Sequence, residues 1–280
     1  MSAPLNPYSS SSIYPKTDFP SPTWHRDEKS GVITRVKTKR VNGLLSSYTT
    51  AYNLSELIGS GGQGTVYSLK PNGTGKTKAV KRGNSCEKDY AYSFLWPKNA
   101  PGLLMRPKAL FSDQTTKLLV MHKYDCNLKE CISSLTHEQK LDAIYQISRG
   151  VSRLKKLGIK HNDIKLSNIA YDKMKNRYDL IDFGVAKISK KEIKFHKSLK
   201  SSWSLDELSL SKIIDRILFP DVDYVNTMSD KLVAISQLGY STKVTEYLQE
   251  YFAHKDFTPD KIADLFLKAI DEFRRHKSKM

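Results

Sequence analysis

Apolar and polar residues alternate along several short stretches in the first half of the chain, which is the pattern of β-strands. Glycine and asparagine separate these stretches, and Asn72-Gly73 is typical of a hairpin turn. The last stretch has no polar break, which favours a buried strand. The predicted strands cover residues 54–58, 65–69, 78–81 and 117–121.

The second half shows the period of amphipathic helices instead. Thr136 stands where a helix cap is expected, apolar residues recur from Leu141 to Leu154, and Gly158 ends the pattern. A second helix is predicted over 205–218. Thr258 followed by proline starts a third. Strands first and helices afterwards predict an α+β chain with two lobes, and no internal repeat is visible.

The first 47 residues differ in composition from the rest of the chain. Ser and Pro dominate the opening, and basic residues follow between Arg35 and Arg40. Such a composition predicts a disordered tail over 1–47, with at most a short strand around Ile33, and a folded domain over 48–280.

The amino-acid composition limits the kinds of partner that the protein is expected to bind. The formal net charge is +17, which suits acidic partners. Basic residues are not interleaved with aromatic ones, so nucleic acid is disfavoured. No apolar run is long enough to span a membrane. The three cysteines lack C-x-x-C spacing, so neither a disulfide framework nor a zinc site is expected.

A glycine-rich turn joins the first two predicted strands. Glycines let a backbone approach phosphates closely and aim N–H groups at them. An ordinary glycine-rich hairpin is the alternative, and a dinucleotide fold would need a helix after the turn. The candidate nucleotide-binding residues here are Gly59, Ser60, Gly61, Gly62, Gln63, Gly64 and Val66.

Charged residues in two later motifs suit phosphoryl transfer, which needs positioning and charge neutralisation. The first motif runs from His161 to Asn168, and the second is Asp182-Phe183-Gly184. Asp163 is the candidate catalytic residue that accepts a hydroxyl proton, and Asn168 and Asp182 are the candidate magnesium ligands. Lys165 and Lys81 are the candidate cations that neutralise phosphate charge.

Four motifs, in this order, resemble those of the protein kinase superfamily: the glycine-rich turn, Ala79-Val80-Lys81 with its terminal lysine, and the two later motifs. The resemblance covers residues from about 54 to at least 218. It implies a strand-rich N-lobe over about 48–121 and a helical C-lobe over about 125–280. It also implies ATP with Mg²⁺, or Mn²⁺ as a substitute, and a protein substrate. Lys165, two after Asp163, favours a Ser/Thr kinase.

The resemblance further implies an adenine pocket and two supports. Met121 would be the gatekeeper, and Asp206 would brace the catalytic loop. Glu87 is the first candidate for the acid that pairs with Lys81, and Asp89 is the alternative. The remaining candidate adenine contacts are Val66, Ala79, His122, Tyr124, Ala170 and Ile181, whose other role would be plain core packing.

The chain also departs from the family. Asn162 replaces the arginine that normally receives an activation-loop phosphate, and no A-P-E sequence lies between Asp182 and Asp206. This shortened activation segment predicts constitutive activity. Its lysines, between 187 and 200, predict a docking site or activator site for an acidic partner.

These reductions resemble the minimal Ser/Thr kinases that bacterial pathogens inject into host cells. That resemblance implies a virulence effector, secreted into the host cytoplasm and acting on a host protein; otherwise the protein is expected in its own cytoplasm. A reduced viral kinase would look similar. A pseudokinase binding module and a small-molecule kinase are the alternative functions.

Overall fold

The computed structural model describes residues 22–42, 44–95, 103–112, 117–188, 204–220, 227–254 and 257–279. The chain forms two compact units. The first comprises residues 1–55 and 69–77, and the second comprises 56–68 and 78–280. Strands β3 (Leu44–Gly61) and β4 (Gly64–Pro71) each contribute residues to both units.

The first unit contains an antiparallel β-ribbon. Strand β1 (Thr23–Arg26) pairs with β2 (Ile33–Val41), and β2 pairs with the first part of β3, which aligns Ile33 with Tyr52. Both of these side chains are buried, and the ring of Trp24 lies 5.5 Å from that of Tyr52. This small apolar cluster explains the register, because a slip of one residue would turn Ile33 to the opposite face.

The ribbon corrects the prediction of a disordered tail over 1–47. Residues 1–21 lie outside the described residues, but the second half of the predicted tail forms β1, β2 and the start of β3. Its basic composition was compatible with a strand because main-chain pairing with β3 satisfies the backbone regardless of side chain.

The second unit carries the other strands and every helix of the described residues. Its first sheet continues from β3 and β4 through β5 (Lys78–Arg82) and β8 (Lys117–His122) to β7 (Ala109–Ser112). The short helix α1 (Cys86–Ser93) follows β5 and packs against β8. The strands predicted over 54–58, 65–69, 78–81 and 117–121 are therefore confirmed.

A small second sheet follows in the same unit. Its order is β6-β12-β11-β9, and β10 pairs separately with β13. Short 3₁₀ turns cover residues 132–134, 166–168 and 173–175. The strands are β6 (Leu103–Leu104), β9 (Cys126–Asn127), β10 (Ile159–Lys160), β11 (Ile169–Asp172), β12 (Arg177–Leu180) and β13 (Lys187–Ile188).

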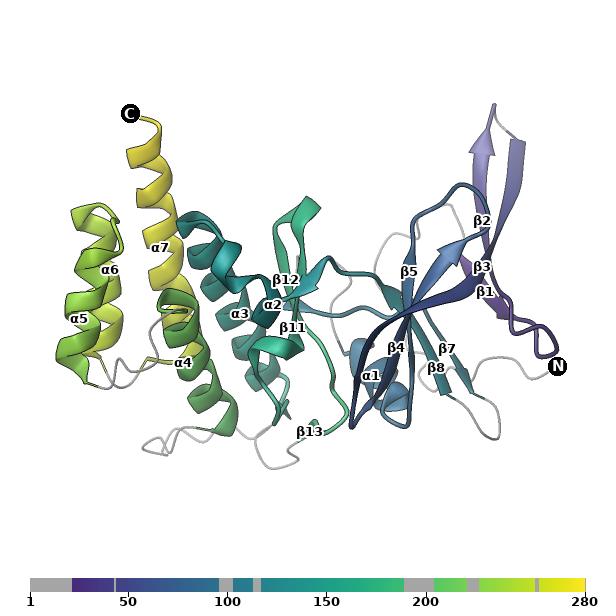
Figure 1. Ribbon diagram of the computed structural model, residues 1–280, viewed down its shortest axis with the longest axis horizontal. Coiled ribbons are helices and arrows are strands. Elements are labelled where there is room, and N and C mark those ends of the chain that lie inside the picture. The colour runs from purple at the N-terminus through teal and green to yellow at the C-terminus, as the bar shows by residue number, and fades with distance from the viewer. Residues whose placement is uncertain are drawn as a thin grey trace. The chain divides into compact units, whose positions relative to one another are not determined.

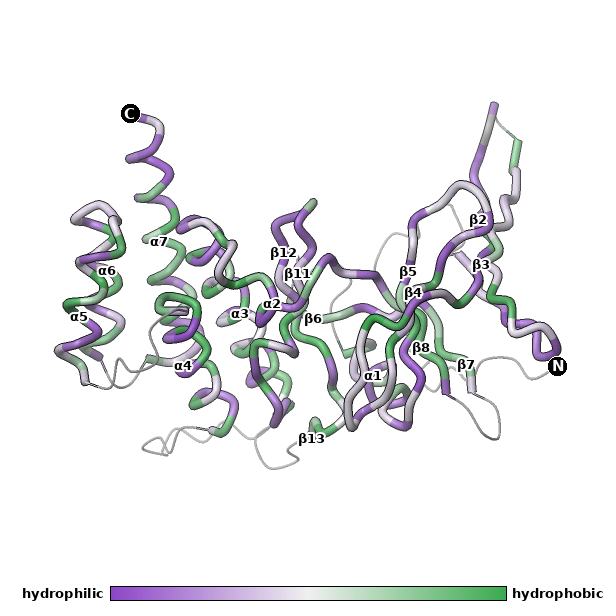
Figure 2. Tube along the Cα trace, viewed as in Figure 1, coloured by the Kyte–Doolittle hydropathy of each residue, from purple (hydrophilic) through white to green (hydrophobic). Residues whose placement is uncertain are grey.

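Helices fill the rest of the unit, and α3 packs against both α4 and α7 (Figure 1). Apolar residues recur along α7, whereas its last turn is hydrophilic (Figure 2). The helices are α2 (Leu128–Cys131), α3 (His137–Lys156), α4 (Leu205–Leu218), α5 (Met228–Gln237), α6 (Thr242–Ala253) and α7 (Pro259–Lys277).

Local signals explain where these helices begin and end. The Thr136 side chain accepts a hydrogen bond from the Gln139 N–H in a reciprocal capping box, and Gly158 adopts a φ of 66° just after α3. Thr258 caps α7 in front of its proline. The predicted α+β class, with strands first and helices afterwards, is confirmed.

Among the described residues, every helix is too short or too polar to cross a bilayer.

Candidate active site

The loop from His161 to Asn168 is held from below by Asp206. This carboxylate accepts hydrogen bonds from the backbone N–H groups of His161 (2.7 Å) and Asn162 (2.8 Å). Asp206 is buried in the first turn of α4, where the helix N-terminus also favours a negative charge. The geometry therefore matches the bracing role expected from the sequence.

Asp163 occupies the centre of this loop. The Asn168 side-chain amide donates to the Asp163 carboxylate (2.8 Å) and to its backbone carbonyl (2.9 Å), which fixes the carboxylate in place. The Lys165 ammonium lies 2.8 Å from the same carboxylate. The Asp163 side chain remains 30% exposed, so a hydroxyl group can reach it. A positioned base beside a cation is the arrangement that phosphoryl transfer requires.

Lys81 connects two carboxylates across the site. Its ammonium lies 2.7 Å from Asp89 and 2.8 Å from Asp182. Burial alone would lower the pKa of Lys81, but the two carboxylates raise it above its usual value. The Lys81 side chain is therefore a permanent cation, held at a defined place beside the Asp182 carboxylate.

The prediction that Glu87 pairs with Lys81 is wrong. Glu87 pairs with Lys117 (2.9 Å) and is half exposed, whereas Asp89 is the buried partner. The reason is helical geometry. Cys86 and Asp89 are the buried residues of α1, and residues three apart share a helix face. The spacing from Cys86, the one apolar residue near the start of the helix, was the signal that could have selected Asp89.

The segment after Asp182 is held by side chains from α1 and from the loop between His161 and Asn168. The Asp89 carboxylate accepts from the Phe183 N–H (2.6 Å). Three further side chains then donate to consecutive carbonyls: Lys88 to Gly184 (3.1 Å), Asn162 to Val185 (3.3 Å) and Tyr92 to Ala186 (3.0 Å). We call these four donors and acceptors, Lys88, Asp89, Tyr92 and Asn162, the segment clamp. Sequence reasoning missed Lys88 and Tyr92, since neither belongs to a motif.

The glycine-rich turn packs against the end of β5. A Cβ atom at Gly64, whose φ is 138°, would collide with the Arg82 carbonyl, and Ser85 donates to the Gln63 carbonyl (3.0 Å). By contrast, added Cβ atoms at Gly59, Gly61 and Gly62 would meet open space. The turn therefore has one side fixed to the fold and one side available to a ligand.

This difference predicts unequal responses to alanine. Gly64→Ala is expected to lower stability by about 1–3 kcal/mol, because it combines backbone strain with a collision. Gly62→Ala is the matched control and should leave the melting temperature within about 2 °C. Thermal unfolding of both purified variants measures the effect. Equal melting temperatures would contradict the fixed geometry of the turn.

Most of the predicted adenine contacts gather in one apolar cluster. Ala79 and Met121 are buried in it, and Val66, Tyr124 and Ile181 pack against it. Ala170 is buried on β11, outside this cluster. The side chain of His122 lies 2.9 Å from the Asp172 carboxylate. The structure thus brings five of the predicted contacts together around an apolar surface of the kind an aromatic base requires.

The donor set fits a hard divalent cation such as Mg²⁺. Asp182 supplies carboxylate oxygen, and Asn168 directs its amide nitrogen to Asp163, which leaves its amide oxygen for another partner. Within the described ranges no three His, Cys, Asp or Glu side chains gather as a metal cluster. A pair of oxygen ligands that needs nucleotide phosphates to complete the shell is typical of magnesium sites.

The chain is similar to a family of known proteins. The model of the family described as "Protein kinase domain" matches residues 52–205. The stress-activated protein kinase jnk-1 of Caenorhabditis elegans is 27% identical over 221 residues, which cover 67% of this chain and 47% of that protein. The stress-activated protein kinase JNK of Suberites domuncula is 25% identical over 269 residues, covering 80% and 74%.

A third relative comes from Acanthamoeba polyphaga mimivirus and carries the provisional name serine/threonine-protein kinase/receptor. It is 30% identical over 146 residues, which cover 48% of this chain and 9% of the viral protein. The chain therefore spans about half the length of jnk-1 and under a tenth of the viral relative.

Proposed function

Because this chain belongs to the protein kinase family, we propose that it transfers the γ-phosphate of ATP to serine or threonine hydroxyls of a protein. The observation that supports this most is the joint placement of Lys81, Asp163, Lys165, Asn168 and Asp182. Each of the five polar groups that phosphoryl transfer uses is present and oriented by a named hydrogen bond or ion pair.

In the proposed reaction Asp163 accepts the proton of the substrate hydroxyl and orients its oxygen for attack. Lys165, at 2.8 Å from Asp163, neutralises charge on the moving phosphoryl group. Lys81 holds the nucleotide phosphates, and Asn168 and Asp182 would hold Mg²⁺. The bound ion supplies charge neutralisation of the phosphates.

The test is transfer from γ-labelled ATP in a cell lysate, followed by phosphoamino-acid analysis of the labelled protein. Label on serine or threonine supports the proposal, and label on tyrosine alone would exclude Ser/Thr specificity. Label on small molecules only would favour a small-molecule kinase, and no label at all would favour a pseudokinase.

We further propose that this activity needs no activating phosphate. The segment clamp supports this, because Asn162 and the three residues of α1 hold residues 183–186 through hydrogen bonds that need no phosphate group. No arginine stands beside Asp163 to receive a phosphate. Of the predicted basic segment, Lys187 is described and exposed, and residues 189–203 lie outside the described residues.

Protein made in bacteria is accordingly expected to keep its initial rate after phosphatase treatment, within about twofold. The rate of peptide phosphorylation before and after treatment measures this. Mass spectrometry is the control that phosphate has been removed. A fall of tenfold or more would show that a phosphate switch operates.

The effector role and the acidic partner remain predictions from the sequence. An effector would act on a host protein, and a polyanion or acidic protein that raises the initial rate would support the partner.

A further inference from the structure

The β2–β3 hairpin ends in a tip that exposes two leucines. Strand pairing runs as far as Val41 and Leu44, and Asn42 adopts a φ of 49°, a left-handed conformation that suits a tight turn. The Leu44 side chain is 73% exposed and that of Leu45 is 64% exposed. Because neighbouring strand residues point to opposite faces, the tip is apolar on both faces. We call Leu44 and Leu45 the leucine tip, and both belong to the first unit.

Basic residues stand directly behind this tip on both faces of the hairpin. Lys37 and Lys39 share one face with Leu44. Arg40 pairs across the hairpin with Leu45 and therefore shares the other face. All three basic side chains are exposed, and we call them the basic collar. Figure 2 shows the same contrast, with the hydrophobic start of β3 beside the hydrophilic end of β2.

The charge of the basic collar is not neutralised by nearby acids. The sequence has no Asp or Glu between residues 29 and 55. Within the described ranges, no carboxylate forms an ion pair with any of the three collar residues. The Lys39 ammonium lies 5.8 Å from the centre of the half-exposed Tyr48 ring, a contact that leaves its charge in place. The hairpin end therefore combines exposed apolar surface with three uncompensated cations.

This combination limits the kinds of partner that the hairpin end fits. Nucleic acid would match the cations, but its phosphates cannot bury the leucines. A second copy of the tip would bury the leucines, but it would bring two basic collars together. A protein groove would have to enclose both faces of the hairpin and carry acids around its rim. A lipid surface with anionic headgroups meets both requirements, because it buries apolar side chains below a layer of negative charge.

From this arrangement we propose that the leucine tip and the basic collar dock the protein onto an anionic lipid surface. The two leucines insert at the boundary between headgroups and acyl chains, and the three cations contact the headgroups. Tyr48 suits the same place, since tyrosine rings are enriched at membrane–water interfaces. The association is peripheral and reversible, because two leucines bury little apolar area.

Binding of the full chain to lipid vesicles tests the proposal. The probes are vesicles of phosphatidylcholine alone and vesicles in which about a third of the lipid is phosphatidylserine, each separated from free protein by sedimentation. We expect binding to the anionic vesicles to be at least about tenfold tighter and to weaken as salt rises. Neither ATP nor a second protein is present, so the result is independent of the proposed kinase activity.

A leucine variant separates insertion from simple adsorption of a basic protein. Leu44→Ser with Leu45→Ser keeps the net charge of +17 and should weaken binding to anionic vesicles by about tenfold or more, because apolar burial is lost. The matched control is Met174→Ser with Val233→Ser, which removes two exposed apolar side chains elsewhere and should bind as the wild type does. Leu45→Ser alone, with an expected loss of about threefold, serves if the double variant does not fold.

A charge variant tests the basic collar. Lys37→Gln with Lys39→Gln should weaken binding to anionic vesicles by about tenfold, since each cation near the surface contributes. Lys261→Gln with Lys268→Gln is its control, because it removes the same charge from the exposed face of α7, and its binding should stay within about twofold of the wild type.

Two results would overturn the proposal. If the leucine variant binds anionic vesicles as tightly as its control, the protein is adsorbed by net charge alone. If the full chain does not bind anionic vesicles, the leucine tip belongs to a protein partner instead.

Discussion

Asp163→Asn is expected to lower the rate of phosphoryl transfer by about 10²- to 10⁴-fold. Asparagine has nearly the same shape and can still accept the hydrogen bond from Asn168, which is 2.8 Å long in the structure. It cannot accept the proton of the substrate hydroxyl at neutral pH. The loss should therefore fall on the chemical step, with the affinity for ATP nearly unchanged.

Single-turnover rates and nucleotide titrations of the purified variant measure these two quantities. The control is Asp264→Asn, which removes one exposed carboxylate from α7 and should behave as the wild type does. Transfer at the wild-type rate by the Asp163 variant would exclude Asp163 as the base.

Asp89→Asn is expected to have the second large effect, on stability as well as on activity. Asp89 is buried against Lys81 at 2.7 Å and also accepts from the Phe183 N–H at 2.6 Å. Asparagine keeps an acceptor for the N–H but removes the buried negative charge. We expect a loss of about 3 kcal/mol in the free energy of unfolding, at the low end for a broken buried pair because Asp182 remains.

The same change should lower transfer by about 10²-fold or more, because Lys81 loses the partner that positions it. Glu87→Gln is the matched control on the same helix. Its pair with Lys117 is exposed, so stability should change by less than about 0.5 kcal/mol. Denaturant unfolding and initial rates of both variants decide the question. If Glu87→Gln were the damaging change, the assignment of Asp89 would be overturned.

Local signals in the sequence were sufficient for the strands predicted over 54–58, 65–69, 78–81 and 117–121 and for the helices α3, α4 and α7. Helix starts at Thr136 and Thr258 depend on contacts within one turn, so their caps are visible in the sequence. Each of the motifs around Gly64, Asp163 and Asp182 places its functional residues within a few positions of one another. The order of these motifs along the chain identified the family that the later comparison matched.

Contacts between residues that are far apart in the sequence could be identified only from the tertiary structure. The sequence by itself determined that an acid near Lys81 was available, but only the orientation of α1 decided between Glu87 and Asp89. Strand β2 depends on pairing with β3, and β1 depends on pairing with β2, and the polar composition of this stretch concealed both strands. The hydrogen bonds from Lys88 to Gly184 and from Tyr92 to Ala186 likewise connect residues that are far apart in the sequence.

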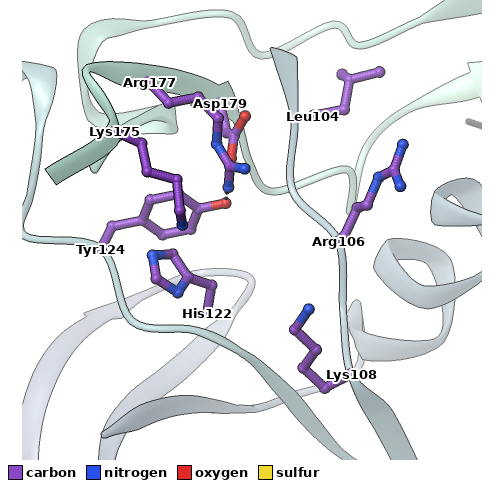
Figure 3. Close-up of a pocket in the computed structure, with 8 residues that line it drawn as sticks. All are labelled: Leu104, Arg106, Lys108, His122, Tyr124, Lys175, Arg177 and Asp179. Carbon is purple, nitrogen blue, oxygen red and sulfur yellow. Dashed lines mark hydrogen bonds and ion pairs between the residues drawn. The ribbon is translucent and has the colours of Figure 1, made fainter. Parts of the chain in front are cut away.

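A pocket lined by basic side chains shows the same division between sequence and tertiary structure (Figure 3). Each of its basic residues is unremarkable in a chain with 46 Lys and Arg, and none belongs to a motif. Folding brings Arg106 and Lys108 opposite Lys175 and Arg177. The sequence by itself determined the net charge, which needs only composition, and the capped helices and short motifs, which depend on neighbouring residues. The tertiary structure decided which of those charges face one another, because packing between remote segments sets that distance.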